Sequence, residues 1–578
     1  MIRKTIKQML TAQVLSALTV SLCLLIDNIM IGNFIGVRGL TAYGLANPLL
    51  LFVGAIGSML SAGVQVVCSR SLGKGQKDET DKGYSSAIAI VLFVSLFVVL
   101  AVVLFRAPLA RLLGAGGNQE LLKDTGDYLV GFVVGALGSM GALILVPFLQ
   151  MAGKSNLLIF SVLGMTIADI VLDYLLAVVL PLRMLGMGLA SSASYYIALL
   201  IGGRYFLKKD CVFHFKFAYV KVKKMLELLK AGIPTVVNMA TSVGLIFIMN
   251  RLLLKSGGSM AVAAYSVICT VGNAANCIST GSGGVALTLS SMFYHEEDRT
   301  GLREMLSSLK KYSLLMGLVM TGAIMAAAPL IISLFVPEAG ASQDMAISGA
   351  RWYACGLTFC CINNAIRSTW QGCERVTLTE LTSILEGFVL PVLAALLLRA
   401  ATGVDAIWAF YFAGEALTLL GIYLYTSVKK HNWLPVTANQ LLLPEGFGVA
   451  ESDLIEANIT STEDVLSAAR AASDFCLAHG QTSLIANRIA LCIEEMGTNT
   501  VKYGFTDGRP HQLNVRVQHK GERWILRFRD NCHAFDPVSH IPSGDAQDSL
   551  GIRVLLGMSR EIRYTYSMNL NNLTIVVK

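Results

Sequence analysis

Residues 84–105, YSSAIAIVLFVSLFVVLAVVLF, form an unbroken stretch of 22 residues without a charged side chain. A helix needs about 20 apolar residues to cross the ~30 Å hydrocarbon core of a bilayer. A helix also satisfies every backbone hydrogen bond within itself, which lipid requires. This stretch therefore predicts a membrane-spanning helix.

Similar apolar runs recur as far as residue 428, and we predict twelve spans in all. The predicted spans are 10–33, 45–70, 84–105, 126–150, 156–180, 185–206, 233–255, 261–292, 311–335, 346–370, 377–400 and 405–428. The composition agrees, because the 578-residue chain is 54% hydrophobic and only 15% charged, whereas a soluble domain is about 25% charged. The predicted fold class is an all-α polytopic bundle followed by a small soluble α+β domain.

Lysine and arginine are concentrated in alternate loops between the predicted spans. The richer set lies at 3–7, 70–82, 154, 204–230, 299–311, 367–375 and 429–430. Basic loops stay in the cytoplasm, so we predict a bacterial inner-membrane protein with both termini cytoplasmic. The net charge of +8 is explained by these loops beside the lipid bilayer, and we predict no nucleic-acid partner.

A weak internal repeat divides the spans into two halves. The segment Asp27–Gly44 is similar to Met249–Ser266, and each begins at the end of the first helix of a six-helix half. Internal repeats of this kind are common in transporters. The predicted domains are an N-terminal six-helix half (1–207), a cytoplasmic connecting amphipathic helix (208–232), a C-terminal half (233–430), a linker (431–450) and a soluble domain (451–578).

Three short motifs in the helical part resemble the MATE (multidrug and toxic compound extrusion) transporters. They are Asp27-Asn28-Ile-Met-Ile-Gly-Asn-Phe-Ile-Gly, the segment Ser69–Gly75, and Gly232-Ile233-Pro234. The resemblance covers roughly residues 5–430. It implies two six-helix bundles that face a central cavity, with export of small organic molecules driven by H⁺ or Na⁺.

Acidic residues inside the predicted spans are candidates for the coupling site, because an ionisable group at bilayer depth costs several kcal/mol. Asp27 lies in the first span, and Asp169 and Asp173 lie four residues apart on one face of the fifth. The MATE resemblance implies a cation site at an Asp in helix one and an Asn-x-x-x-Asp in helix five. Asp169 replaces that Asn, so H⁺ and Na⁺ both stay open. Glu386 and Glu415 also lie deep, where they line the cavity or pair with polar neighbours.

Residues 451–578 have the alternation of a soluble domain. We predict a helix from Ser461 with Asp464 in the capping-box position, a second helix at 484–503, strands at 512–519, 523–529, 561–566 and 572–578, and a helix at 550–558. This order predicts one antiparallel sheet with helices on one face.

Three motifs in this domain, in order, resemble the N, G1 and G2 boxes of the GHKL ATPases, in the branch of the anti-sigma-factor serine kinases. They are Glu494–Gly504, Asp530–Pro537 and Ser549–Ile552. The resemblance implies that Mg-ATP binds through Asn499, Lys502, Asp530 and Gly551, with Asn499 as the Mg²⁺ ligand and Glu495 as the catalytic base. It also implies an anti-anti-sigma-like protein or another regulator as a partner.

The soluble domain departs from this pattern at the glycines. Cys532, Ala534 and Ser549 occupy glycine positions of the boxes, and a Cβ there hinders the approach of a nucleotide to the backbone. Two functions therefore stay open: an exporter with an ATP-binding regulatory domain, or a membrane-tethered serine kinase that uses the helices as a sensor or anchor. ATP-driven transport is disfavoured, because the chain has no Gly-x-x-x-x-Gly-Lys-Ser/Thr loop.

Overall fold

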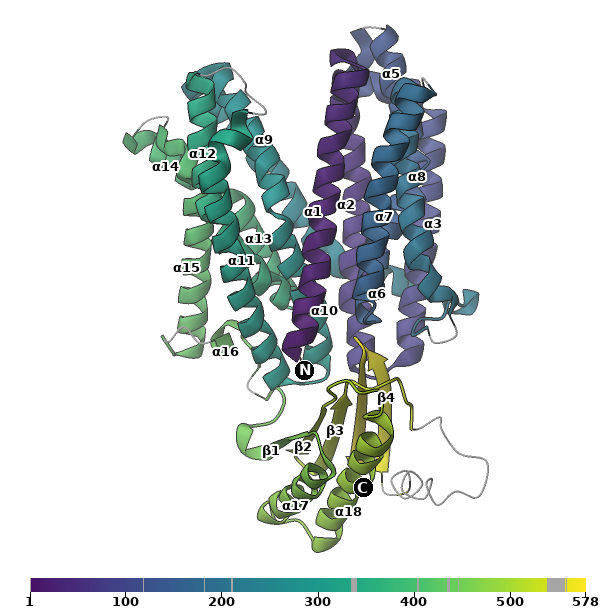
Figure 1. Ribbon diagram of the computed structural model, residues 1–578. Coiled ribbons are helices and arrows are strands. Elements are labelled where there is room, and N and C mark those ends of the chain that lie inside the picture. Colours follow the sequence, from purple (N-terminus) through teal and green to yellow (C-terminus); the bar gives the residue numbers. More distant parts are fainter. Residues whose placement is uncertain are drawn as a thin grey trace.

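The computed structural model describes residues 2–117, 119–180, 182–208, 211–333, 340–402, 405–433, 437–444, 446–537, 557 and 559–577. Within them, a bundle of long helices stands over a small sheet domain (Figure 1). We call residues 451–578 the tail. The end of the bundle that the tail contacts is called the tail end.

The N-terminal half is built from seven main helices and one π-helical segment. They are α1 (Ile2–Phe34), α2 (Val37–Gly73), α3 (Lys77–Leu104), α5 (Gln119–Val133), α6 (Ala136–Met151), α7 (Ser155–Asp173), η2 (Tyr174–Val179) and α8 (Arg183–Gly203). A short helix, α4 (Arg106–Leu112), joins α3 to α5.

The C-terminal half repeats this plan. Its helices are α9 (Val222–Ala275), α10 (Cys277–His295), α11 (Arg299–Ser333), α12 (Ala341–Gly372), α13 (Val376–Ile384), the π-helical η5 (Leu385–Val389), α14 (Leu390–Thr402) and α15 (Phe410–Lys430). Among the described residues, eight helices are long and apolar enough to cross a membrane, or ten if each of two bent helix pairs forms one span. A multi-pass membrane bundle is thus confirmed, while the count of twelve spans stays a prediction.

The predicted repeat has a matching backbone feature in each half. Gly36 separates α1 from α2 with φ 86° and ψ −171°, and Gly258 breaks α9 with φ 68° and ψ −161°. Each glycine stands nine positions after the start of its repeated segment, at Asp27 and Met249. A residue with a side chain rarely adopts this conformation, so both halves turn at an equivalent glycine.

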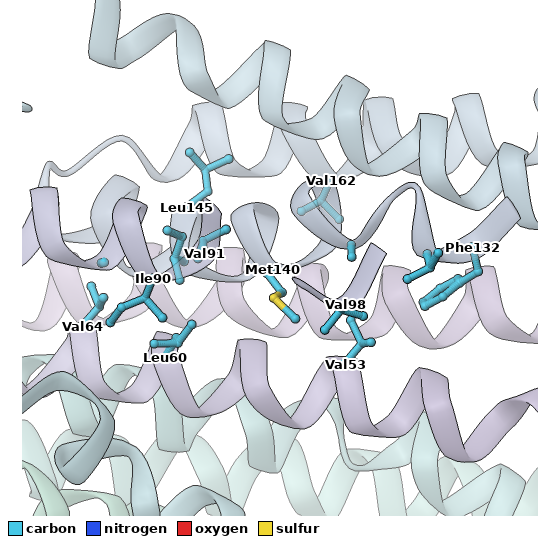
Figure 2. Packing of buried hydrophobic residues seen from close by; sticks show 14 of the residues in the cluster. Val53, Leu60, Val64, Ile90, Val91, Val98, Phe132, Met140, Leu145 and Val162 are labelled. Carbon is cyan, nitrogen blue, oxygen red and sulfur yellow. The ribbon is translucent and has the colours of Figure 1, made fainter. Parts of the chain in front are cut away.

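Apolar side chains fill the space between the helices of the N-terminal half. Val53, Leu60 and Val64 lie on one face of α2, and Figure 2 shows them beside Ile90 and Val98 of α3. Small residues also line contacts between helices. An added Cβ on Gly135 would lie 2.5 Å from the Ser192 Cα of α8, so these helices approach closely, as helices in lipid commonly do.

The predicted connecting helix at 208–232 is wrong for its first part. The described residues from 211 to 221 form irregular chain with one short 3₁₀ turn, Phe217–Tyr219, and α9 begins only at Val222. Side chains of α3 hold the backbone instead: the amides of His214 and Lys216 donate to Asp81 and Ser85. Tertiary hydrogen bonds here replace the helical ones that the sequence pattern favours.

The tail has the predicted sheet with helices on one face. Its strands are β1 (Leu454–Ile459), β2 (Leu513–Lys520), β3 (Arg523–Asp530), β4 (Ser559–Ser567) and β5 (Leu570–Val577), all antiparallel in the order β1-β2-β3-β5-β4. Helices α17 (Thr462–Ala478) and α18 (Ser483–Asn499) bury the apolar face. The predicted capping box is confirmed, since Ser461 Oγ accepts from the Asp464 amide and Asp464 accepts from the Ser461 amide.

The opposite face of the sheet is polar and contacts both halves of the bundle. The β4–β5 turn contacts the N-terminal half, where the Met568 amide donates to the Met151 carbonyl at 2.8 Å and Asn569 Nδ2 to the Gly153 carbonyl at 2.7 Å. Strands β2 and β3 contact the acidic loop Glu296–Asp298 of the C-terminal half. The tail therefore connects the two halves at the tail end (Figure 1).

Candidate cation site and tail pocket

The three aspartates predicted as a coupling site come together in the N-terminal half. Asp27 of α1 meets Asp169 and Asp173 of α7, and one carboxylate oxygen of each lies within 4.8 Å of the others. All three are buried, with 5%, 4% and 0% of their surface exposed. The i, i+4 spacing places the α7 pair on one face, and the packing of α1 against α7 adds Asp27.

Several oxygens of these carboxylates have no hydrogen-bond partner. Among the described residues, this applies to one oxygen of Asp27, one of Asp169 and both of Asp173. Three negative charges this close cannot share a dry site without compensation. Carboxylate oxygens bind hard cations, and they also bind protons. The arrangement can therefore hold protons or a metal cation.

The backbone is irregular where Asp173 lies. Helix α7 ends at Asp173 and continues as the π-helical segment η2. The C-terminal half has the same feature, because η5 follows α13 and contains Glu386. Single π-helical turns inside helices are rare and are often found at functional sites.

The acidic residues of the C-terminal half form a different cluster. Glu386, Glu415 and Cys360 lie with their ligand atoms within 4.8 Å of one another and are buried. Arg367 Nη1 donates to Glu386 Oε2 at 2.8 Å, and Asn363 Nδ2 donates to Glu415 Oε2 at 2.8 Å. Of the two predicted roles for these glutamates, pairing with polar neighbours is confirmed.

Arg367 does not lie in a cytoplasmic loop, although the pattern of basic residues predicts this position. Arg367 lies inside α12 and is only 9% exposed. The signal was available, because the residue falls within the predicted span 346–370. An arginine there needs a buried acidic partner, and Glu386 provides it.

We expect Arg367→Met to destabilise the protein by about 3–5 kcal/mol, because it leaves the Glu386 carboxylate buried without its partner. The double variant Arg367→Met with Glu386→Met should recover most of this loss. Thermal unfolding of the purified variants in detergent measures both changes in stability. Equal destabilisation by the single and double variants would contradict this account of the pair.

The tail has a pocket of about 470 Å³ between α18 and the ends of β3 and β5. Two predicted nucleotide contacts, Asn499 and Asp530, line it together with apolar residues such as Met496 and Phe528. Small-molecule pockets typically measure about 300–1,000 Å³, with apolar walls and few polar groups. The described lining therefore fits the size and polarity of a heterocyclic base.

Asp530 is held by a small hydrogen-bond network in this pocket. Its Oδ1 accepts from Asn571 Nδ2 at 2.7 Å and from the Cys532 amide at 2.9 Å. Burial raises the pKa of the Asp530 carboxyl above its usual value, and the Asn571 and Cys532 hydrogen bonds oppose that rise. The carboxyl is thus fixed in orientation at the pocket wall.

Two other predicted tail residues, Glu495 and Lys502, lie outside the described lining of this pocket. Glu495 lies one turn before Asn499 in α18. The Lys502 ammonium instead lies 4.8 Å from the centre of the Tyr503 ring. Gly551, Ser549 and the predicted helix 550–558 fall largely outside the described residues, so the phosphate end of the predicted site has no described structure.

Comparisons of sequence find similarity to known exporters. The MatE family model matches residues 13–175. The chain is 28% identical over 232 residues to the multidrug export protein MepA of Staphylococcus haemolyticus, and 27% identical over 232 residues to MepA of Staphylococcus aureus. Each match covers 39% of this chain, and the chain spans about half (50%) of the length of these curated relatives.

Comparisons of structure cover more of the chain. A MATE family transporter of the MOP superfamily, solved in its outward-facing conformation, gives a TM-score of 0.67 at 19% identity over 74% of this chain and 97% of that one. A MOP superfamily transporter from Pyrococcus furiosus, described as having a binding pocket of reversed polarity, gives 0.68 at 18% over 77% and 97%. The helical part of this chain therefore has the fold of the MATE transporters, and the MatE family model matches its N-terminal half.

Proposed function

We propose that this chain is a MATE-type antiporter that exports small organic molecules across a bacterial inner membrane in exchange for H⁺ or Na⁺. The observation that carries the proposal is the group of three buried aspartates with unpartnered oxygens. A site that needs a cation for neutrality, inside a fold built from two similar halves, is suited to couple cation movement to export. The fold and the resemblance to the MepA exporters support the same class of function.

The test is gradient-driven transport by the full chain in liposomes. An imposed H⁺ or Na⁺ gradient should drive uptake of a fluorescent organic cation such as ethidium, and an ionophore for that cation should stop it. Ethidium movement that is unchanged after the gradient is collapsed would contradict cation coupling. Empty liposomes provide the control for passive leakage.

We also propose that the tail binds Mg-ATP and regulates the bundle. Support comes from the pocket that brings Asn499 and Asp530 together and from the contacts of the tail with both halves. In this proposal Asn499 holds the Mg²⁺, and Asp530 binds the adenine base of ATP. When bound, Mg-ATP would supply the phosphoryl group for the alternative function, phosphorylation of a serine on a regulator.

Asn499→Ala should weaken Mg-ATP binding to the full chain by about tenfold or more, because the Mg²⁺ loses the side-chain oxygen that holds it. Titration with a fluorescent ATP analogue measures this affinity. Thr498→Ala is the matched control, because Thr498 precedes Asn499 in α18 and is not part of the described pocket lining. An unchanged affinity in Asn499→Ala would remove the proposed role of this residue.

A further inference from the structure

A second cavity lies where the tail meets the bundle. It has a volume of about 70 Å³, and three parts of the chain surround it: the end of α2 at Gly73–Gly75, the loop after α10 at His295–Asp298, and the polar face of the sheet. A single water needs about 10–15 Å³ measured in this way. The cavity therefore has room for a small polyatomic ligand or several waters.

The wall that the sheet contributes to this cavity is strongly basic. Arg516, Arg527, Arg529 and Arg563 line it, and Lys74 lines the bundle side. The strand register places Arg516 directly opposite Arg527. Like charges opposite each other destabilise a sheet, so this arrangement needs negative charge nearby.

Only part of that charge is supplied by carboxylates. Arg516 Nη1 contacts Asp298 Oδ1 at 2.6 Å, and Arg529 Nη2 contacts Glu296 Oε2 at 2.7 Å. At the edge of the cavity, Arg516 also pairs with Glu456 and Arg563 with Glu561. Among the described residues, no carboxylate forms an ion pair with Arg527 or Lys74.

Arg527 also has unused hydrogen-bond donors. Its Nη2 donates to the Glu296 carbonyl, but its buried Nε and Nη1 have no partner among the described residues. Burial lowers the pKa of this guanidinium below its usual value, against the opposing effect of Glu296 and Asp298. A charged group and hydrogen-bond donors that are removed from water without a partner destabilise the folded state.

We propose that this cavity binds a small oxyanion of the phosphate class, which neutralises Arg527 and Lys74. The source is either free phosphate or the phosphodiester headgroup of an anionic lipid, since α2, a candidate membrane span, ends at this cavity. Guanidinium is the preferred protein partner for phosphate oxygens. Because the cavity has walls from the tail and from both halves, the bound anion strengthens the docking of the tail. This proposal is independent of the transport function.

The first test is thermal unfolding of the full chain in an uncharged detergent. Sodium phosphate should raise the melting temperature above the value in sodium chloride of equal ionic strength, because a ligand of the folded state stabilises it. Arg527→Met should abolish this difference. Without added anion, the variant should melt at or above the wild-type temperature, because it removes an uncompensated charge.

Arg523→Met is the matched control. Arg523 lies on β3 four residues before Arg527 and on the same face, but it is exposed. It should keep the full phosphate response. Equal shifts in phosphate and chloride, or a phosphate response that survives in Arg527→Met, would overturn the proposal.

A second measurement identifies the source of the anion. It also detects an anion that stays bound to the protein during purification. Phosphorus analysis of the protein after removal of free lipid should find about one phosphate group per chain in the wild type and none in Arg527→Met. In nanodiscs, a lipid source predicts that phosphatidylglycerol raises the melting temperature relative to phosphatidylcholine without added phosphate. A free-phosphate source predicts no difference between the two lipids. Failure of both the phosphorus analysis and the melting shift would overturn the proposal.

Discussion

Asp173→Asn should abolish cation-driven export while the protein still inserts and folds. Asp173 is fully buried, and neither of its oxygens has a partner among the described residues. It is therefore the carboxylate that most needs a bound cation. Loss of one member of a buried charge pair costs about 2–5 kcal/mol, so the affinity for the cation should fall by about 30-fold or more.

Ethidium transport in liposomes under an imposed gradient measures this effect, at protein levels matched by immunoblot. Asp344→Asn is the control, because Asp344 is an exposed carboxylate in the first turn of α12. Asn has the same shape as Asp, so packing around α1 and α7 is kept. Normal gradient-driven export by Asp173→Asn would contradict the assigned role of this residue.

Asp298→Asn should release the tail from the bundle. Asp298 Oδ1 accepts from Arg516 Nη1 at 2.6 Å and from the Gly301 amide at 2.7 Å, and the residue is 2% exposed. Burial alone would raise the pKa of its carboxyl, but Arg516, Arg529 and Arg527 together hold that pKa below its usual value. Neutralising it breaks the buried ion pair with Arg516 and leaves that guanidinium only its pair with Glu456, at a cost of about 3 kcal/mol.

Hydrogen exchange of the Met568 amide reports the docking, because this amide donates to the Met151 carbonyl across the interface. Exchange should become about 100-fold faster in Asp298→Asn. Glu297→Gln is the neighbouring control: Glu297 pairs with Lys520, and both are about half exposed, so the change should cost less than about 1 kcal/mol. Equal protection of Met568 in both variants would show that the acidic loop does not hold the tail.

The sequence was most informative where a feature is local. Hydrophobic runs predicted the helical bundle, the alternation after residue 512 predicted the strands, and Ser461 with Asp464 predicted a helix start that the structure confirms. The i, i+4 spacing predicted that Asp169 and Asp173 share a face. Only the packing of α1 on α7 could bring Asp27 to them, because periodicity gives no distance between helices.

The features that the sequence does not predict all depend on tertiary contacts. The chain before Val222 carries a helical pattern, but hydrogen bonds from α3 hold it in another conformation. The pattern of basic residues predicts a loop position for Arg367, but its partner Glu386 stabilises it inside α12. The basic face of the sheet was visible in the sequence as alternate arginines in β3, but the sequence did not show what covers it.

The central claim is that a cation bound by the three aspartates moves in exchange for the exported molecule. Its most direct test is a measurement of cation flux in liposomes after addition of ethidium. An internal pH dye follows H⁺, and radioactive sodium follows Na⁺. We predict ethidium-dependent movement of one of the two cations through the wild type, and none through the variant with Asn at positions 27, 169 and 173. Equal cation flux through that variant, or ethidium transport by the wild type without movement of either cation, would contradict the account.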